Sequence, residues 1–300
     1  MRITSLATCD RERMGTSDYP ALYRSADQCS LSSQRAFFGV LLGEIALLVL
    51  AAVLSILDSH SAGVAVFQAA LLLGALGCAI YLFAAKPDRY WYAARAVAES
   101  VKTLTWRYVS RAEPFEVDVA SARLHFCVTL RSVVEQNHDV AKRLVADLEG
   151  VQITPAMESM RTKGLEDRKA AYLKGRVTEQ QGWYAKKSRA NTVMARRFFG
   201  ALTLVISAGA LFAIARVHFV TVSHWPTDVL VALATALLVW IQAKRFSELA
   251  GSYALAAHEI SILREQATLA TDDERLSSFV GDAENAFSRE HTQWVARKDV

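Results

Sequence analysis

Two polar side chains lie inside otherwise apolar stretches, and they are the residues of this chain best placed to do chemistry. Glu44 lies eight residues into the stretch 37–57, and Gln68 lies five residues into the stretch 64–85. A charged group at that depth in a bilayer costs on the order of 3 kcal/mol, so it needs a reason. Glu44 either faces water or a partner in an assembled pore, or is a protonated or snorkelling side chain near the inner leaflet. Gln68 is a second pore-lining candidate, but its amide is also suited to hydrogen-bond a neighbouring helix.

Common nucleotide-binding and catalytic motifs are missing from the sequence. It contains no GxxxxGK[ST] loop, no GxSxG elbow, no HExxH pair and no GxGxxG turn. His218 and His224 are six residues apart, without a carboxylate or a third ligand nearby. The four cysteines show no CxxC spacing. We therefore expect no enzyme activity, no metal site and no cofactor.

Four apolar segments must position the two polar side chains. The composition is 52% hydrophobic and 21% charged, which is apolar for a soluble protein. At a rise of 1.5 Å per residue, each segment covers roughly 25–35 Å, about the thickness of the hydrocarbon layer. The predicted spans are residues 37–57, 64–85, 198–215 and 226–243. The sequence therefore predicts an all-α, multi-pass membrane protein, with two transmembrane helical hairpins and long cytosolic helices that form a helical bundle.

The basic residues indicate the orientation of the hairpins. Lysines and arginines gather at the outer ends of both hairpins, whereas the two links between paired spans carry only Arg216. The positive-inside rule then places both termini and the central segment in the cytoplasm. Residues 86–197 hold 21 Lys and Arg against 13 Asp and Glu. This excess orients the spans and contacts anionic lipid, or it binds an anionic ligand or partner. No aromatic-interleaved recognition motif supports a nucleic-acid partner.

The start of each hairpin repeats one short motif. "RAFFG" begins at Arg35 and "RRFFG" at Arg196, and an offset of 161 residues superimposes the two diphenylalanine-glycine steps. Arginines suit the phosphate layer and aromatic rings suit the interface. The predicted membrane-interface residues are Arg35, Phe37, Phe38, Arg196, Arg197, Phe198 and Phe199. The sequence similarity between the two halves extends beyond this motif. It predicts an internal duplication of one unit, which consists of a cytosolic helix, a span, a turn, a second span and a second cytosolic helix.

Small residues within the spans favour close helix packing. Gly39 and Gly43 form a GxxxG step on the first span, Gly74 belongs to a small-residue ladder on the second, and Gly209 to one on the third. These positions can serve packing within one chain or between chains. Four spans are too few to enclose a wide aqueous pore, so a channel built from them must be a homo-oligomer.

The cytosolic parts are predicted to be helical. Residues 88–110 contain no glycine or proline after the second span, which predicts that this span continues as one helix into the cytoplasm. Residues 117–150 predict an amphipathic helix whose apolar face carries Leu124, Val128, Val133 and Val134. The predicted organisation is a disordered tail at 1–17, a first module at 18–112, a cytosolic helix and linker at 113–153, and a second module at 154–300.

Two stretches resemble a known family. "YLKGRVTEQQGWYAKKSRANTVMARRFF" (172–199) resembles the first helix of SLATT domains, and "ALYRSADQCSLSSQRAFF" (21–38) is similar to the corresponding stretch of another SLATT subfamily. The matching positions are Tyr172, Arg176, Gln180, Trp183, Tyr184, Lys187 and Asn191 in the second copy, and Tyr23, Ala26, Asp27, Ser30 and Gln34 in the first. Together the two modules would cover nearly the whole chain.

The resemblance implies a role in the bacterial inner membrane. SLATT proteins are regarded as effectors of bacterial conflict systems, which permeabilise the membrane when a nucleotide second messenger or a partner protein triggers them. It therefore implies an oligomeric, pore-forming effector of an anti-phage or conflict response, triggered through its cytosolic helices. The alternative is a non-conducting membrane scaffold or sensor that recruits a soluble partner. The family brings no established catalytic or ligand residues.

Overall fold

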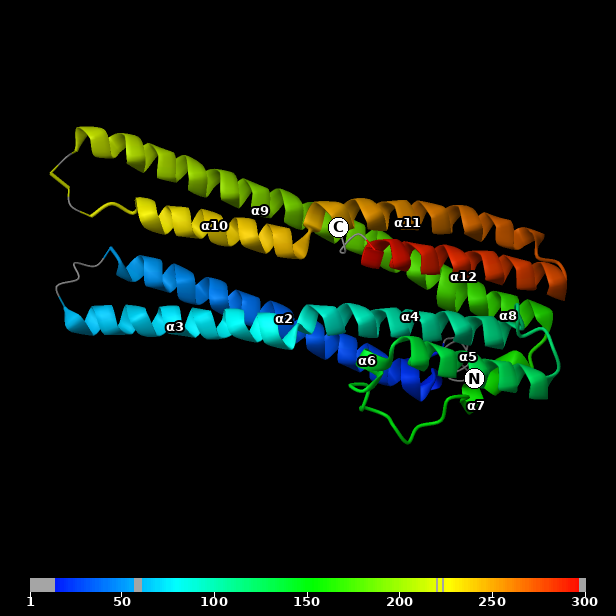
Figure 1. Ribbon diagram of the computed structural model, residues 1–300. Helices are drawn as coiled ribbons and strands as arrows, with labels where there is room; N and C mark the ends of the chain where they lie inside the picture. The colour runs from blue at the N-terminus through cyan, green and yellow to red at the C-terminus, as the bar shows by residue number, and fades with distance from the viewer. Residues whose placement is uncertain (1–13, 57–60, 220, 223, 297–300) are drawn as a thin grey trace, which may run out of the picture. The chain divides into compact units, whose positions relative to one another are not determined.

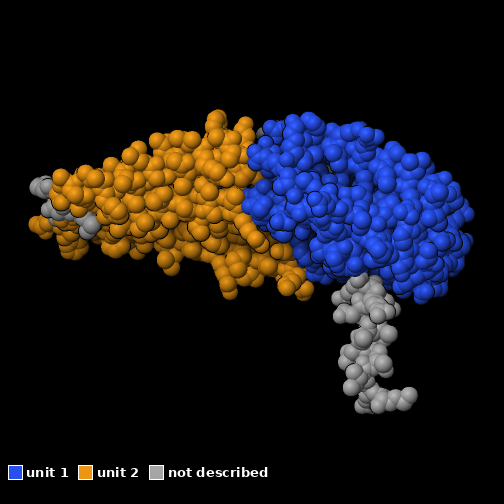
Figure 2. Space-filling view, turned by 90° about the horizontal axis from the view of Figure 1, so that it is seen from below, with its two compact units in different colours: residues 1–34, 88–185, 254–300 blue, residues 35–87, 186–253 orange. Residues whose placement is uncertain are grey.

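The computed structural model describes residues 14–56, 61–219, 221–222 and 224–296, with the side chains of the last helix followed as far as Phe287. The chain divides into two units, coloured separately in Figure 2. Unit 1 comprises residues 1–34, 88–185 and 254–300, and unit 2 comprises residues 35–87 and 186–253. Helix accounts for nearly all of the described chain and no strand occurs there. The predicted all-α class is confirmed.

Unit 2 contains the apolar helices of two hairpins. Helices α2 (Ala21–Leu54) and α3 (Ala62–Ala85) form the first, and α9 (Glu179–His218) and α10 (Thr227–Lys244) form the second (Figure 1). Among the described residues, four helices are long and apolar enough to cross a membrane, and hardly any of their most apolar stretch is buried within the protein. An apolar surface of this extent needs lipid or other helices around it. The multi-pass membrane fold is therefore confirmed, although Leu57, the expected end of the first span, lies outside the described residues.

The second helix of each hairpin ends at a cation in the left-handed conformation. Lys86 has φ 45° and ψ 52° after α3, and Arg245 has φ 50° and ψ 41° after α10. Their backbone N–H groups donate to Leu82 O and Ile241 O, which closes each helix. The expected single helix across residue 86 is therefore wrong: α4 (Pro87–Ser110) starts anew, because proline cannot donate to the preceding turn and disfavours the α conformation at the residue before it.

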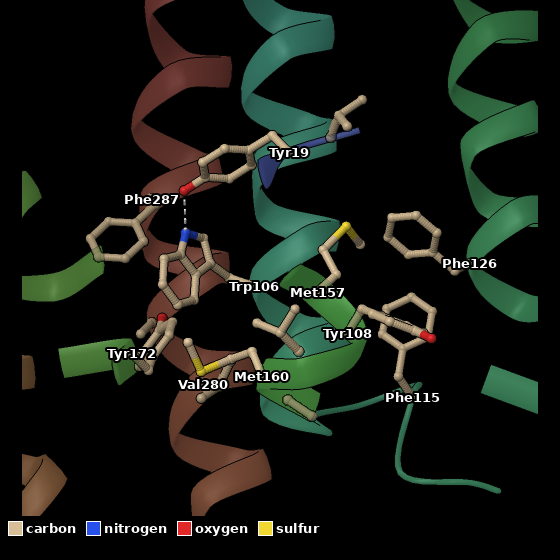
Figure 3. Packing of buried hydrophobic residues seen from close by; sticks show 14 of the residues in the cluster. Tyr19, Trp106, Tyr108, Phe115, Phe126, Met157, Met160, Tyr172, Val280 and Phe287 are labelled. Carbon is tan, nitrogen blue, oxygen red and sulfur yellow. Dashed lines mark hydrogen bonds between the residues drawn. The ribbon is translucent and has the colours of Figure 1, made fainter. Parts of the chain in front are cut away.

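Unit 1 is a helical bundle built from both halves of the sequence. It contains α4, α5 (Val119–Gln136), α6 (His138–Ala141), α7 (Pro155–Arg161), α8 (Leu165–Tyr172), the π-helical turn η3 (Leu173–Thr178), η4 (Ala267–Leu269) and α12 (Asp273–Ala296), with most of α11 (Phe246–Gln266). Trp106 lies at its centre, donating from Nε1 to the Tyr19 hydroxyl at 3.0 Å (Figure 3). Tyr172 meets the Trp106 ring edge-on. Such aromatic pairs add to the burial of their surface.

The N-terminal stretch contributes to this core. Thr16–Asp18 form the short 3₁₀ helix η2, and Tyr19 directly after it is buried. Thr154 donates from its hydroxyl to Asp18 O at 2.7 Å, which fastens the stretch to the start of α7. Of the tail expected to be disordered at 1–17, residues 1–13 lie outside the described residues.

The amphipathic helix predicted over 117–150 is shorter, and its buried face is partly different. α5 ends at Gln136, because Asn137 leaves helical geometry and its side-chain amide donates to Val133 O at 2.9 Å. The buried side chains are Ala122, Phe126 and Leu130, whereas Leu124 and Val128 are exposed. Val133 does pack against the core. Both sets of residues recur at helical spacing, and the large ring of Phe126, which touches Tyr108 and Phe115, determines which face is buried.

The left-handed residues allow a direct test of backbone strain. Replacing Lys86 by glycine removes the Cβ that disfavours this conformation, and we expect the free energy of unfolding to rise by about 0.5–1 kcal/mol. Lys86→Val should lower it, because a β-branched residue is poorly tolerated at positive φ. Denaturant unfolding of the full chain in detergent measures both. Equal stability of the two variants would contradict the assigned backbone geometry.

Candidate functional site

The two polar residues of the first hairpin have different surroundings. Gln68 donates from Nε2 to the carbonyl oxygen of Ala51 at 3.0 Å, and so joins α3 to α2. Glu44 is half-buried, and its carboxylate has no hydrogen-bond or ion-pair partner among the residues that the structure describes. The amide of Gln68 is therefore engaged within the hairpin, and the carboxylate of Glu44 remains available.

The four glycines also divide into two groups. A Cβ built on Gly74 would lie 3.2 Å from Leu47 Cδ1, and one on Gly209 would lie 3.7 Å from Leu230 Cβ, so both glycines face the partner helix of their own hairpin. A Cβ on Gly39 or Gly43 would meet no described atom within 4 Å. The GxxxG step therefore does not pack a helix of the described chain.

The repeated diphenylalanine motif is used differently in its two copies. Phe38 contacts Trp240 edge-on at 5.9 Å between ring centroids, and Lys244 Nζ lies 3.3 Å from the centroid of the Phe38 ring. A cation held over an aromatic face in this way is stabilised electrostatically. These contacts join the first hairpin to the second within unit 2.

In the second copy the motif contacts the first residue of α11, directly after its own hairpin. Phe198 stacks on Phe246 at 5.3 Å, while Phe199 is 67% exposed. The arginines of both motifs, Arg35, Arg196 and Arg197, are exposed, as expected for groups that meet lipid phosphates. Phe37 lies edge-on to Phe38. The two interfaces are thus alike in composition and different in contacts.

Unit 1 holds a buried ion pair that was not predicted from the sequence, although one of its members, Arg176, belongs to the second family-like motif. Arg176 and Glu284 are 1% and 0% exposed, and the guanidinium donates to both carboxylate oxygens, Nε to Oε1 at 2.9 Å and Nη2 to Oε2 at 2.8 Å. This two-point geometry is the strongest form of an arginine–carboxylate contact. The Arg176 guanidinium also lies over the ring of Phe287.

Side chains from both modules form hydrogen bonds with this ion pair, so that it belongs to a larger network. Thr103 donates to Glu284 Oε2 at 2.8 Å, and Tyr172 donates to Glu284 Oε1 at 3.0 Å. Arg176 Nη1 has no hydrogen-bond partner among the described residues, and its nearest carboxylate is Glu99 at 3.8 Å. We call the set Arg176, Glu284, Thr103, Tyr172, Glu99, Arg95 and Asp27 the Arg176 network.

The outer end of the network reaches helix α2. Arg95 contacts Glu99 at 2.7 Å and Asp27 at 3.5 Å. Asp27 belongs to the motif of the first copy, and Tyr172 and Arg176 belong to that of the second. Residues that carry the family resemblance in both copies therefore meet in one cluster, which is buried at Arg176 and partly exposed at Asp27.

The network changes the pKa of Arg176 and of two neighbouring side chains, Tyr23 and Lys102. Burial alone would lower the pKa of the Arg176 guanidinium, but the carboxylates of Glu284 and Glu99 outweigh it and raise that pKa. Burial, with Asp27 and Glu99 nearby, raises the pKa of Tyr23 to about 12. Burial, followed by repulsion from Arg176, lowers the pKa of Lys102. Arg176 therefore stays charged throughout the physiological range.

Arg176 lies on a π-helical turn. Residues Leu173–Thr178 adopt this wider helix between α8 and α9, and the three elements run continuously from Leu165 to His218. A Cβ built on Gly175 would lie 3.0 Å from Cη2 of Trp106, so a larger residue would require this ring to shift by a few tenths of an ångström. π-turns are rare and occur often at functional sites.

No catalytic centre is apparent in the described parts of the chain. Within the described residues, no three His, Cys, Asp or Glu side chains are grouped to hold a metal ion. His218 and His224 show no such grouping. The absence of enzyme activity and of a cofactor stays a prediction.

The paired hairpins, the helical unit built from both halves and the repeated motif define the class: a multi-pass membrane protein with two copies of a two-span module. Comparison with protein-family models gives the family. The model of SMODS and SLOG-associating 2TM effector domain 3 matches residues 20–169, and that of SMODS and SLOG-associating 2TM effector domain 1 matches residues 172–294. The chain belongs to the SLATT family and carries two different SLATT domains in tandem.

These matches bear on organisation as well as family. The first runs on through residues 113–153, and the boundary between the two falls at 169–172, at the end of α8. The search of curated proteins and the search of solved structures each returned no match. SLATT domains are two-span effector domains, so the chain is a membrane effector.

The buried pair allows a test of what holds unit 1 together. Glu284→Gln leaves the Arg176 charge buried without its counterion, and we expect the free energy of unfolding to fall by about 3–5 kcal/mol. The double variant Arg176→Met, Glu284→Leu should recover much of that loss, because it removes both charges. Chemical denaturation of the full chain in detergent measures these changes.

An exposed ion pair serves as the matched control. Arg131 and Glu135 on α5 lie 3.5 Å apart with side chains 80% and 69% exposed, so Glu135→Gln should cost less than about 1 kcal/mol. A loss for Glu284→Gln no larger than that of the control would contradict a buried, network-bound Arg176.

Proposed function

We propose that this chain is an oligomeric, pore-forming effector that permeabilises the bacterial inner membrane in an anti-phage or conflict response. The observation that carries the proposal is the contrast within the hairpins. Gly74 and Gly209 are packed inside the chain, whereas Gly39, Gly43 and the Glu44 carboxylate have no described partner. A GxxxG step lets two backbones approach closely, and an uncompensated carboxylate in a span needs water or a partner. A second copy of the chain supplies a helix that packs on Gly39 and Gly43 and a partner for the Glu44 carboxylate.

The trigger acts through unit 1 in this proposal, and either a nucleotide second messenger or a partner protein delivers it. Because α8, η3 and α9 form one continuous helix, the π-turn is suited to transmit the signal to the third span. Conversion of a π-turn to α-helical hydrogen bonding shifts the register by one residue, which turns the following helix by about 100°. The Arg176 network holds the π-turn and so sets how readily it converts.

Unit 1 and both termini are cytoplasmic in this proposal. The support is the distribution of basic residues, since Arg35, Lys86, Arg196, Arg197 and Arg245 all flank the outer ends of the hairpins. Nucleic acid is not expected as a partner, because the basic residues accompany no recognition motif.

A non-conducting scaffold that recruits a soluble protein is the second candidate. One observation favours it: Leu124 and Val128 on α5 are 65% and 57% exposed and lie one helical turn apart. Exposed apolar side chains in a soluble bundle suit a protein contact. This function predicts stable co-purification of a soluble protein and no loss of membrane potential on overexpression.

Assembly is tested by glycine variants that the single chain tolerates equally. Gly43→Leu should shift the full chain in nanodiscs from oligomer to monomer, because the added side chain blocks close approach of a second helix. Gly77→Leu is the matched control, since a Cβ there also meets no described atom within 4 Å and it lies outside the GxxxG step. Mass photometry reads the oligomeric state. A monomeric wild-type chain, or equal assembly of both variants, would rule out assembly through this step.

The carboxylate of Glu44, which has no described partner, allows a test of conduction. Glu44→Gln preserves shape and removes the charge, so cation flux and the resulting membrane depolarisation should fall several-fold while membrane insertion is unchanged. A potential-sensitive dye in cells that express the chain at matched levels reports the effect. Gln242→Ala on α10 serves as the control, because it leaves Glu44 intact and should retain the wild-type response. Depolarisation that is unaltered in Glu44→Gln would remove this residue from the conducting path.

A further inference from the structure

A cleft in unit 1 opens between the start of α4 and the junction of α5 with α6. It is an open cleft with a volume of about 310 Å³, and a few residues of each segment line it. Its lining consists of Arg89, Tyr90 and Ala93 on one side and of Gln136, Asn137, His138, Asp139 and Val140 on the other. Neither the Arg176 network nor the spans contribute a residue to it, so the cleft is separate from the features described above.

Its polar groups suit a phosphate. Arg143 lies with its guanidinium carbon 3.5 Å from the centroid of the Tyr90 ring, which holds the cation beside the cleft. Arg89 and Asp139 are 3.9 Å apart and 70% and 79% exposed, so their mutual attraction is weak and the guanidinium keeps donors for another acceptor. Planar guanidinium groups bind phosphate oxygens at two points.

The cleft lies close to the end of a span along the chain. Arg89 follows Ala85, the last residue of α3, by four residues, which reach at most roughly 14 Å even when fully extended. Tyr90, Trp91 and Tyr92 follow directly, and the last two rings stack at 4.3 Å. Consecutive aromatic residues next to a span are typical of the headgroup layer. A phosphate that reaches Arg89 is therefore close to the membrane surface.

We propose that this cleft binds the headgroup of an anionic phospholipid, with Arg89 holding the phosphate and Arg143, stacked on the lining residue Tyr90, adding positive charge beside the cleft. Its polar lining offers hydrogen-bond partners, Gln136 and Asn137, to the hydroxyl groups of a glycerol headgroup. The inference rests on the span that ends at Ala85 and is independent of pore formation.

The test compares lipid retained by the full chain. Purified protein is reconstituted in nanodiscs of phosphatidylcholine with one-fifth phosphatidylglycerol, extracted, and analysed for bound lipid by native mass spectrometry. The wild-type chain should retain phosphatidylglycerol in preference to phosphatidylcholine. In the double variant Arg89→Gln with Arg143→Gln, this preference should fall by about thirtyfold, or about fivefold for each arginine. Arg89→Lys with Arg143→Lys keeps the charges and should retain most of it.

Two controls decide between the alternatives. Arg123→Gln with Arg131→Gln removes two exposed arginines of α5 outside the cleft and should leave the preference unchanged. Equal loss in this control would show a general charge effect and overturn the site, as would full retention in the Arg89 and Arg143 glutamine variant. Inorganic phosphate and glycerol phosphate, added in detergent, should not displace the lipid at millimolar concentration. Displacement by either would assign the cleft to a soluble anion and overturn the lipid proposal.

Discussion

Burial of the Arg176 guanidinium is the constraint on which unit 1 depends. The Arg176 side chain is 1% exposed, and such a buried charge is stable only when its counterion and hydrogen bonds are in place. Glu284 is the counterion and accepts two hydrogen bonds from the guanidinium. Glu284 in turn accepts from Thr103 and Tyr172. The helices that carry these side chains must therefore form together, and the aromatic packing of Trp106 against Tyr172 is built around the same point. The unit 1 helices of the two modules thus share one core.

Much of the fold could be predicted from the sequence, because the strongest signals were local. Spans follow from continuous apolar runs, and the start of α12 follows from the side chain of Asp272, whose carboxylate accepts from Arg275 N at 2.8 Å. The break at Lys86 could have been predicted from Pro87, because proline disfavours the α conformation at the residue before it. The buried face of α5 was partly missed because two apolar sets share its period, and only tertiary packing of Phe126 separates them. The Arg176 network was missed because its residues are far apart in sequence; a charged residue within the family motif was the one available signal.

The two modules share a repeated motif but differ in the contacts that it makes. Phe38 packs on Trp240 and Lys244 of the other hairpin, whereas Phe199, its counterpart 161 residues later, is exposed. Gly43 and Glu44 have Leu204 and Val205 as counterparts, so the polar, small-residue step occurs in the first hairpin alone. Divergence of this kind lets one copy take a specialised role while the other keeps the shared core. The pore proposal accordingly assigns the lining to the first hairpin.

The most direct measurement of this account is a double-mutant cycle across the two modules, with Thr103→Val in the first and Glu284→Gln in the second. The free energy of unfolding of the full chain in detergent is measured for both single variants and for the double variant. The account predicts a coupling energy of about 1–3 kcal/mol, because the two side chains share one buried hydrogen bond within the network. Additive effects within about 0.3 kcal/mol would show that Thr103 and Glu284 do not interact, and would contradict a core shared by the two modules.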